Sequence, residues 1–216
     1  MFNIGLTDSV DNPVMLILAV VLAYLIGNIS PSILMARAKG IDIRKEGSGN
    51  AGTTNALRVM GKKAGAITLV VDVLKGTFAV LLGGALAGHV GMMLCVIAVF
   101  CGHVWPVFFG FRGGKGVATA FGALMGLNPL LGLSTLAVVV IGVLISRRMS
   151  VGSLLGAVAF PFLAVFFEKD FVLLGSILAL IVLIKHRGNI MRLFRGQEPV
   201  MSIFEKKKRD EDISRS

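Results

Sequence analysis

Long apolar stretches alternate with short polar ones along most of this chain. Backbone polar groups inside hydrocarbon must find partners within their own segment, and the alternating pattern of a β-barrel strand is absent from these stretches, so each is predicted to be a helix. We therefore predict an all-α, polytopic membrane protein with seven transmembrane helices. These are expected at Pro13–Ala36, Ala64–Ala87, Val90–Gly110, Val117–Leu127, Leu130–Ile145, Val151–Phe167 and Phe171–Ile184.

Composition agrees with a membrane domain. The 216 residues are 55% hydrophobic and 16% charged, whereas a soluble domain is about 45–50% apolar and about 25% charged. Residues 1–200 are expected to form a single transmembrane domain. Residues 201–216 are expected to be a charged cytoplasmic tail, because the sequence from Glu205 reads EKKKRDEDISRS. The first 13 residues contain no Lys or Arg, so they are not predicted to be a signal peptide.

The distribution of basic residues predicts the orientation. With seven spans and the N-terminus outside, 20 of the 22 Lys and Arg residues fall in segments on the inner side. Lys75 lies within a span and Lys169 lies outside. The positive-inside rule favours this arrangement, which places the C-terminus in the cytoplasm. An alternative with five spans, in which the fourth span joins the fifth and the sixth joins the seventh, moves only Arg147 and Arg148 to the outside.

Three polar segments on the inner side differ from ordinary connectors. They combine glycine, hydroxyl or amide side chains, and cations. Glycine lets backbone N–H groups approach an anion, the polar side chains add donors, and Lys or Arg adds charge, so the combination suits phosphate. The segments are EGSGNAGTTNALR (46–58), FRGGKG (111–116) and KHRGNIMRLFRGQE (185–198).

Simpler interpretations of these segments are also open. Arg112 and Lys115 would serve equally as topological anchors after a span. The third segment would form an amphipathic helix on anionic headgroups, which accounts well for Arg192 and Arg195 but less well for His186 and Asn189. Within the second predicted span, Asp72 and Lys75 are spaced to pair with each other, or to brace the polar loops from below.

Several other function classes are disfavoured. The letters GSGNAG match GxGxxG, but a membrane span and IDIRKE precede them in place of the buried strand of a nucleotide-binding unit. A net charge of +10 does not indicate nucleic acid binding, because the basic residues follow span ends. Cys95 and Cys101 share one apolar stretch and form no metal-ligating cluster. We predict no metal, no organic cofactor and no nucleic acid partner, and we assign no oligomeric state.

The chain resembles the bacterial acyl-phosphate:glycerol-3-phosphate acyltransferases of the PlsY family. The resemblance runs from Ala23 to Glu198, with small departures at Thr53 and Gly188. The motifs that carry it are, in order, GSGNAGTTN, LRVMGKKAG, LVVDVLKG, GHVWPVFFGFRGGKGVAT and KHRGNIMRLFRGQE.

The resemblance implies a multi-pass protein of the bacterial inner membrane, with its active site at the cytoplasmic face and a role in phospholipid synthesis. It implies transfer of an acyl group from acyl phosphate to the sn-1 hydroxyl of glycerol 3-phosphate, giving lysophosphatidic acid and inorganic phosphate. The partners are the two substrates and membrane lipid. The implied catalytic residues are His186, Ser48 and Lys115. The implied substrate-binding residues are Arg58, Asn189, Asn50, Thr54, Asn55, Gly49, Gly52, Gly113 and Gly114.

The residues themselves are compatible with this reaction. No Ser-His-Asp arrangement is evident, so a covalent acyl-enzyme is not favoured. An acyl phosphate is already activated, and the protein needs mainly to position two phosphates and a hydroxyl. His186 is either a general base or a residue that holds glycerol 3-phosphate while a substrate phosphate accepts the proton, and we favour the second role. A small transporter of an anionic metabolite is the alternative function.

Overall fold

The computed structural model describes residues 12–201 and residue 204, and every regular element within them is helical. The charged tail predicted for 201–216 lies almost wholly outside the described residues, as does the acidic N-terminal stretch. The α-helices are α1 (Pro13–Gly27), α2 (Pro31–Ala38), α3 (Thr53–Met60), α4 (Lys62–Val104), α5 (Val117–Leu127), α6 (Pro129–Ser146), α7 (Met149–Phe167), α8 (Val172–Lys185) and α9 (Arg187–Phe194). Two short 3₁₀ helices, η1 (Val107–Phe109) and η2 (Lys169–Phe171), complete the set.

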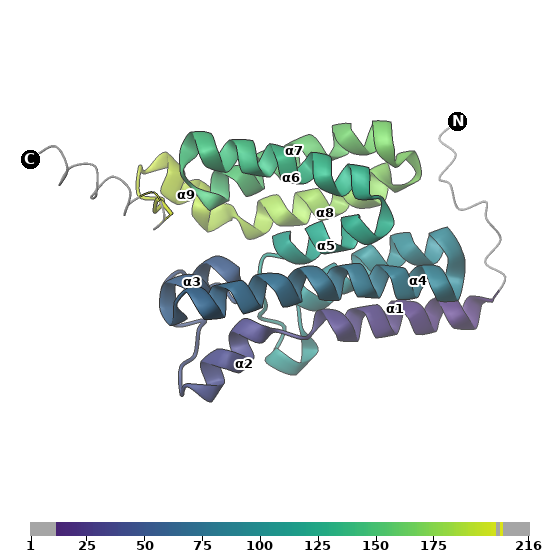
Figure 1. The fold of residues 1–216 in the computed structure, drawn as a ribbon, viewed down its shortest axis with the longest axis horizontal. Helices are drawn as coiled ribbons and strands as arrows, with labels where there is room; N and C mark the ends of the chain where they lie inside the picture. The colour runs from purple at the N-terminus through teal and green to yellow at the C-terminus, as the bar shows by residue number, and fades with distance from the viewer. Residues whose placement is uncertain (1–11, 202–203, 205–216) are drawn as a thin grey trace, which may run out of the picture.

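The long helix α4 is a hairpin of two antiparallel helices. Its backbone leaves the helical region at Ala87 and Gly88, and Gly88 has a φ of 61°. In a straight helix the 28 residues between Lys75 and His103 would span about 42 Å, yet Lys75 Nζ lies 2.9 Å from His103 Nδ1. The chain therefore reverses direction at Ala87–Gly88, between the second and third spans predicted from the sequence (Figure 1).

The first and third predicted spans need correction at their inner ends. The expected helix Pro13–Ala36 breaks into α1 and α2, because Pro31 lacks a backbone donor and disfavours helical geometry in the residue before it. Ser30 is accordingly extended, with φ −123° and ψ 90°. The expected helix Val90–Gly110 ends at Val104, before Pro106, and continues only as η1.

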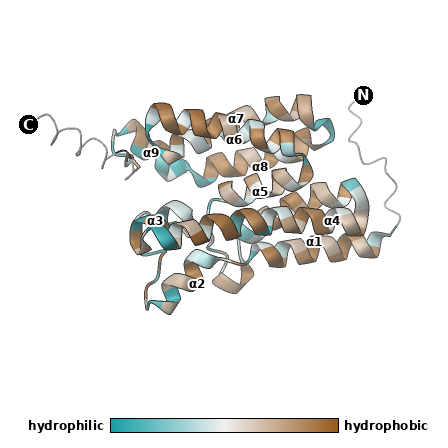
Figure 2. Cartoon of the chain, in the orientation of Figure 1, coloured by the Kyte–Doolittle hydropathy of each residue, from teal (hydrophilic) through white to brown (hydrophobic). Residues whose placement is uncertain are grey.

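The helices have the length and apolar surface of a membrane protein. By length and composition, four helical stretches in the described part of the chain are able to cross a membrane, and the first of them joins α1 and α2 across the break at Ser30. A fifth follows if α8 and α9, bent by 53°, count as one span. One of the four is α4, which folds back on itself. Hydrophobic residues make up most of the long helices (Figure 2). Large apolar side chains are also exposed, among them Ile145, Phe162 and Phe166, at 81%, 68% and 79% exposure. Such a surface requires lipid around it.

Glycine contacts bring the helices close together. α1 packs on the second half of α4 where Gly27 faces Gly102, and a Cβ at Gly27 would lie 2.9 Å from the Gly102 Cα. Close approach through small residues is a common way of joining membrane helices. Because α1 and α4 are fixed here, the connections that follow each of them start from neighbouring points.

The polar segments gather at one end of the bundle. α2, α3 and α9 lie together at that end, whereas α1 begins at the opposite end (Figure 1). The opposite end has polar contacts of its own, since His89 Nε2 lies 3.0 Å from Glu168 Oε1 and Asn128 Nδ2 donates to the Phe167 carbonyl over 2.8 Å. The three glycine-containing segments predicted to converge are thus on the same end of the helical bundle.

Candidate functional site

The first polar segment is held in shape by the side chain of Asn55. This residue is 1% exposed. Its Oδ1 accepts from the Ser48 N–H at 2.9 Å, and its Nδ2 donates to the carbonyls of Ile43 and Glu46 at 3.1 and 2.9 Å. The amide of Asn55 thereby fastens the glycine loop to the first turns of α3. A direct contact between Asn55 and substrate stays a prediction, while bracing of the loop is observed.

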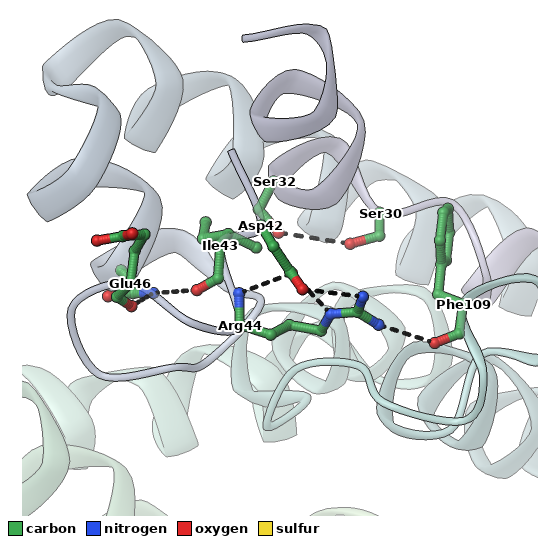
Figure 3. A network of polar contacts seen from close by, with 8 residues as sticks. Ser30, Ser32, Asp42, Ile43, Arg44, Glu46 and Phe109 are labelled. Atoms are coloured by element: carbon green, nitrogen blue, oxygen red, sulfur yellow. Dashed lines mark hydrogen bonds and ion pairs between the residues drawn. The ribbon is translucent and has the colours of Figure 1, made fainter. Parts of the chain in front are cut away.

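The Arg44 guanidinium joins the residues just before the first polar segment to the turn that precedes the second polar segment. Arg44 Nη1 donates to the Phe109 carbonyl at 3.1 Å, and Arg44 Nε donates to Asp42 Oδ1 at 2.9 Å (Figure 3). The hydrogen bonds that Asp42 accepts from the side chain and the backbone N–H of Arg44 lower the pKa of Asp42. The Arg37 guanidinium lies 5.0 Å from the centre of the Phe109 ring. The stretches of chain that lead into the first and second polar segments are therefore linked to each other.

The second polar segment crosses directly over His103 near the end of α4. Gly113 and Gly114 donate their N–H groups to the carbonyls of Val104 and His103, both at 3.2 Å. A Cβ at Gly114 would overlap His103 Nε2 and lie 2.7 Å from the Ala51 carbonyl oxygen. Glycine is needed at this position because the first and second segments touch there.

The third polar segment is organised around one buried carboxylate, Glu198. Its Oε1 accepts from Asn189 Nδ2 at 2.6 Å, and its Oε2 accepts from Arg192 Nε at 2.7 Å. Its backbone carbonyl accepts from Arg148 Nε at 3.0 Å, which ties the segment to the start of α7. With its side-chain nitrogen donating to Glu198, Asn189 presents its Oδ1 to Lys115, and the Lys115 ammonium donates to it. This contact joins the second and third segments.

Positive charge is concentrated around Lys115. Burial lowers the pKa of Lys115 to about 8, with Glu198 opposing the shift and Arg192, Lys185 and Arg58 adding to it through repulsion. Cations drawn from α3, the second segment, α8 and α9 thus act on one point. Such a cluster stores repulsion that a bound dianion would relieve. The arrangement is that of an anion site.

His186 lies in the turn between α8 and α9 and is 3% exposed. Its Nδ1 lies 2.8 Å from the Val182 carbonyl, which only accepts, so Nδ1 carries the proton and Nε2 is left with a lone pair. Burial, reinforced by the charge on Lys115, lowers the pKa of His186 to about 4. The ring is therefore neutral at pH 7 and offers Nε2 as an acceptor, which suits a hydroxyl better than a phosphate.

The residues predicted from the sequence occupy this end of the bundle in different environments. Lys115 and Asn189 are in direct contact, and Ser48 and Asn55 are joined through the Ser48 N–H. Arg58 is exposed on α3. Thr54 lies in the first turn of α3 and is half-buried. The other predicted residues lie on loops: Ser48 and Gly49 are exposed, Asn50 and Gly113 are half-buried, and Gly52 and Gly114 are buried.

Three residues that matter to this geometry were not among the predicted site residues. Glu198 orients Asn189, Arg192 pairs with Glu198 and adds charge near Lys115, and His103 supports Gly114. Arg192, for which a position on lipid headgroups was the simpler interpretation, is half-buried and forms an ion pair with Glu198. The signal for Glu198 was present in the sequence, since it is the sole acidic residue in the segment 185–198.

Comparison with known proteins identifies several similar chains. Residues 17–196 match the family described as Glycerol-3-phosphate acyltransferase. A glycerol-3-phosphate acyltransferase of Thermoanaerobacter sp. (strain X514) is 48% identical over 185 residues, covering 84% of this chain and 93% of that one. A protein of the same name from Clostridioides difficile is 46% identical over 190 residues, with the same coverage of each chain.

Two solved structures are also similar. Both are described as crystal structures of PlsY, an integral membrane glycerol 3-phosphate acyltransferase, and both are 32% identical in sequence. The glycerol 3-phosphate form has a TM-score of 0.82, covering 88% of this chain and 97% of that one. The lysophosphatidic acid form has a TM-score of 0.78, covering 86% and 94% respectively.

Proposed function

This chain belongs to the PlsY family of integral membrane glycerol-3-phosphate acyltransferases, and we propose that it takes its acyl group from acyl phosphate and delivers it to the sn-1 hydroxyl of glycerol 3-phosphate. The sn-1 oxygen attacks the acyl carbon, an ester C–O bond forms, and the bond from that carbon to the phosphate oxygen breaks. The hydroxyl proton leaves with the released inorganic phosphate. The products are lysophosphatidic acid and phosphate. The alternative of a metabolite transporter is set aside because the relatives are acyltransferases.

The setting of Lys115 carries the proposal, because Asn189 holds this cation among three others. Arg58, Lys185 and Arg192 all lie close enough to Lys115 to lower its pKa. Acyl transfer from acyl phosphate brings two phosphate groups to one site, and a cluster of cations around the half-buried Lys115 stabilises the charge on both. The relatives crystallised in glycerol 3-phosphate and lysophosphatidic acid forms support one substrate and one product of this reaction.

Each predicted residue has a proposed role. Lys115 and Arg58 bind phosphate oxygens as charged donors. Neutral His186 accepts a hydrogen bond from a glycerol hydroxyl at Nε2, and Asn189 holds Lys115 in place. Ser48, together with the loop formed by Gly49, Asn50, Gly52, Thr54 and Asn55, encloses the acyl-phosphate group, and Gly113 and Gly114 allow their backbone to approach an anion. A ring with a pKa of about 4 is a weak base at pH 7, so we assign proton acceptance to phosphate.

The proposal includes a location. We infer seven crossings of the inner membrane, with α1, both halves of α4, α5, α6, α7 and α8 each crossing once. The N-terminus is outside, and the polar segments face the cytoplasm. The charge distribution of the sequence and the reversal within α4 support this arrangement. α5 has 11 residues and is too short to cross a membrane of ordinary thickness. We expect the membrane to be thinner beside α5, or polar groups of neighbouring segments to occupy the rest of its depth.

The donor is tested by measuring phosphate release from purified protein in detergent. Phosphate should appear when acyl phosphate and glycerol 3-phosphate are both present, in amounts equal to lysophosphatidic acid. Acyl-CoA in place of acyl phosphate should give no lysophosphatidic acid. Product formation with acyl-CoA alone would refute the donor, and a 2-acyl product by NMR would refute sn-1 specificity.

The orientation is tested by labelling single cysteines in intact cells. Cys95 and Cys101 are first changed to alanine. A cysteine at Lys169, between α7 and α8, should react with a membrane-impermeant maleimide. A cysteine at Lys62, at the start of α4, should react only after the cells are opened. The reverse pattern would invert the topology.

A further inference from the structure

A buried ionic cluster lies inside the bundle beneath the second polar segment, and the proposed chemistry makes no use of it. Asp72 and Lys75, one turn apart in α4, form an ion pair of 2.7 Å with side chains 2% and 3% exposed. Lys75 Nζ also donates to the Ile29 carbonyl at 2.6 Å and to His103 Nδ1 at 2.9 Å. One ammonium therefore joins the α1–α2 connection to both arms of the α4 hairpin.

Lys75 determines the tautomer of His103. An ammonium group only donates hydrogen bonds, so His103 Nδ1 must accept and the ring proton lies on Nε2. The Asp72 carboxylate supplies the charge that keeps Lys75 protonated in this interior, and it lies 3.4 Å from the same Nδ1. Lys75 and Asp72 together fix both the rotation of the ring and the position of its remaining proton.

The protonated side of His103 faces the junction of the two glycine-containing loops. A Cβ at Gly114 would overlap Nε2 and lie 2.7 Å from the Ala51 carbonyl oxygen, so the ring and both loops meet at Gly114. The backbone of His103 contacts the same turn, since its carbonyl accepts from the Gly114 N–H at 3.2 Å. The next residue after Gly114 is Lys115, the cation at the centre of the anion site. Any shift of the His103 ring would therefore move the backbone that carries Lys115.

We propose that Asp72, Lys75 and His103 form a positioning unit. The unit sets how closely the Gly113–Gly114 backbone approaches Ala51, and this distance sets the position of Lys115. The unit does not touch the substrates. Its effect is on the affinity of the site for phosphate-bearing ligands. The inference rests on the proposed function only in taking Lys115 as a phosphate-binding residue, and it does not depend on which acyl donor is used.

The substitution His103→Asn tests the contact of His103 with Gly114 separately from its contact with Lys75. The Asn side chain reaches the place of Nδ1, so it still accepts from Lys75, but it lacks the part of the ring beneath Gly114. We expect the KM and the dissociation constant for glycerol 3-phosphate to rise by about tenfold or more, since small displacements in a preorganised site have effects of this order. We expect kcat to change by less than about threefold. His103→Gln, which reaches the place of Nε2, should restore part of the affinity.

A matched control comes from the other end of the bundle. His89 also contacts a carboxylate, that of Glu168, at 3.0 Å, and it lies far from the polar segments. His89→Asn should leave both constants unchanged while altering the thermal unfolding midpoint. If His103→Asn folds and binds glycerol 3-phosphate as tightly as the wild type, the proposal is wrong.

A second variant covers the case in which His103→Asn does not fold. The double variant Asp72→Asn, Lys75→Met removes both charges at similar side-chain volume, so no uncompensated charge remains in the bundle. It should also weaken glycerol 3-phosphate binding about tenfold, and unchanged binding would refute the unit. Binding is measured by calorimetry with glycerol 3-phosphate alone. A wild type that binds it but releases no phosphate from acyl phosphate would overturn the donor assignment and leave this test intact.

Discussion

The Lys115 ammonium donates a hydrogen bond to Asn189 Oδ1 across 74 positions of sequence. Asn189 accepts it in a fixed orientation because Glu198 occupies its amide nitrogen. A mobile lysine on a glycine-rich turn thereby becomes a positioned cation. In the proposed anion site, the position of Lys115 is thus set by a contact with another polar segment.

Removal of the Lys115 charge should impair phosphate handling. For Lys115→Met we expect kcat/KM for acyl transfer to fall about 10²–10³-fold, the usual effect of losing one positioned donor to developing charge. Phosphate release at varied concentrations of both substrates measures it. Lys115→Arg keeps the charge and should retain more activity than Lys115→Met. An unchanged rate in Lys115→Met would contradict the role of this residue.

The same lysine predicts how activity depends on pH. Its pKa of about 8 is lowered from 10.5, and its protonated form is the one that binds phosphate. In the free enzyme the charge is therefore present below pH 8 and lost as pH rises through 8, so kcat/KM should decline above about pH 8. Lys115→Arg, which stays charged, should show no decline between pH 8 and 9.5. A shared decline in both proteins would assign it to another group.

His186 should affect binding more than the proton transfer. His186→Asn is able to keep the contact with the Val182 carbonyl while removing Nε2, and it should raise the KM for glycerol 3-phosphate about tenfold or more with a smaller fall in kcat. Because the pKa of His186 is about 4, lowering the pH from 7 to 5 should change the activity of the wild type and of His186→Asn by the same factor. If wild-type activity instead falls between pH 7 and 5, and His186→Asn lacks this fall while its KM is unchanged, His186 is a general base.

Asn55 should matter for stability as well as activity. Asn55→Ala leaves the Ser48 N–H and the carbonyls of Ile43 and Glu46 without their present partner. The expected cost is about 1–3 kcal/mol of unfolding free energy, seen as a lower thermal midpoint in detergent. Activity should fall even at temperatures where the protein is folded, because the glycine loop is released. An unchanged midpoint with lower activity would favour direct substrate contact.

The two glycines Gly114 and Gly188 offer a matched pair. Gly114→Ala would overlap His103 Nε2 and crowd the Ala51 carbonyl, whereas a Cβ at Gly188 meets only Arg192 Nη1, at 3.7 Å. Gly114→Ala should raise the KM for glycerol 3-phosphate about tenfold, and Gly188→Ala should leave it unchanged. Substrate titration of both variants checks this difference, and equal KM values would show that the close contact is unimportant.

Much of the fold follows from local sequence signals. The break predicted at Asn128-Pro129 is confirmed, since the Asn128 side chain accepts from the N–H groups of Leu130 and Leu131 at the start of α6. The reversal between the second and third predicted spans is also confirmed. The interruption at Ser30 was missed because the surrounding residues are apolar enough to continue a span, and only Pro31 marks it. Hydropathy reports burial in lipid, while the break depends on backbone hydrogen bonding.

The site was harder to predict than the fold. Charge and topology indicate that the three polar segments share one end of the bundle, and the structure places them there. The contacts that organise them join residues far apart in sequence, as Lys115 with Asn189 and His103 with Gly114, so no spacing rule anticipates them. The bracing role considered for Asp72 and Lys75 is supported by the hydrogen bonds from Lys75 to Ile29 and His103, together with the mutual ion pair.

The position of Glu198 has a consequence for biosynthesis. Every helix from α1 to α9 precedes it in the chain, yet Asn189 and Arg192 are held by its carboxylate. A nascent chain can therefore have inserted all its helices, and carry the glycine loops in place, while still lacking the residue that orients Lys115 through Asn189. The contact that orients Lys115 through Asn189 is therefore completed only after Glu198 has emerged from the ribosome, later than all the helices from α1 to α9.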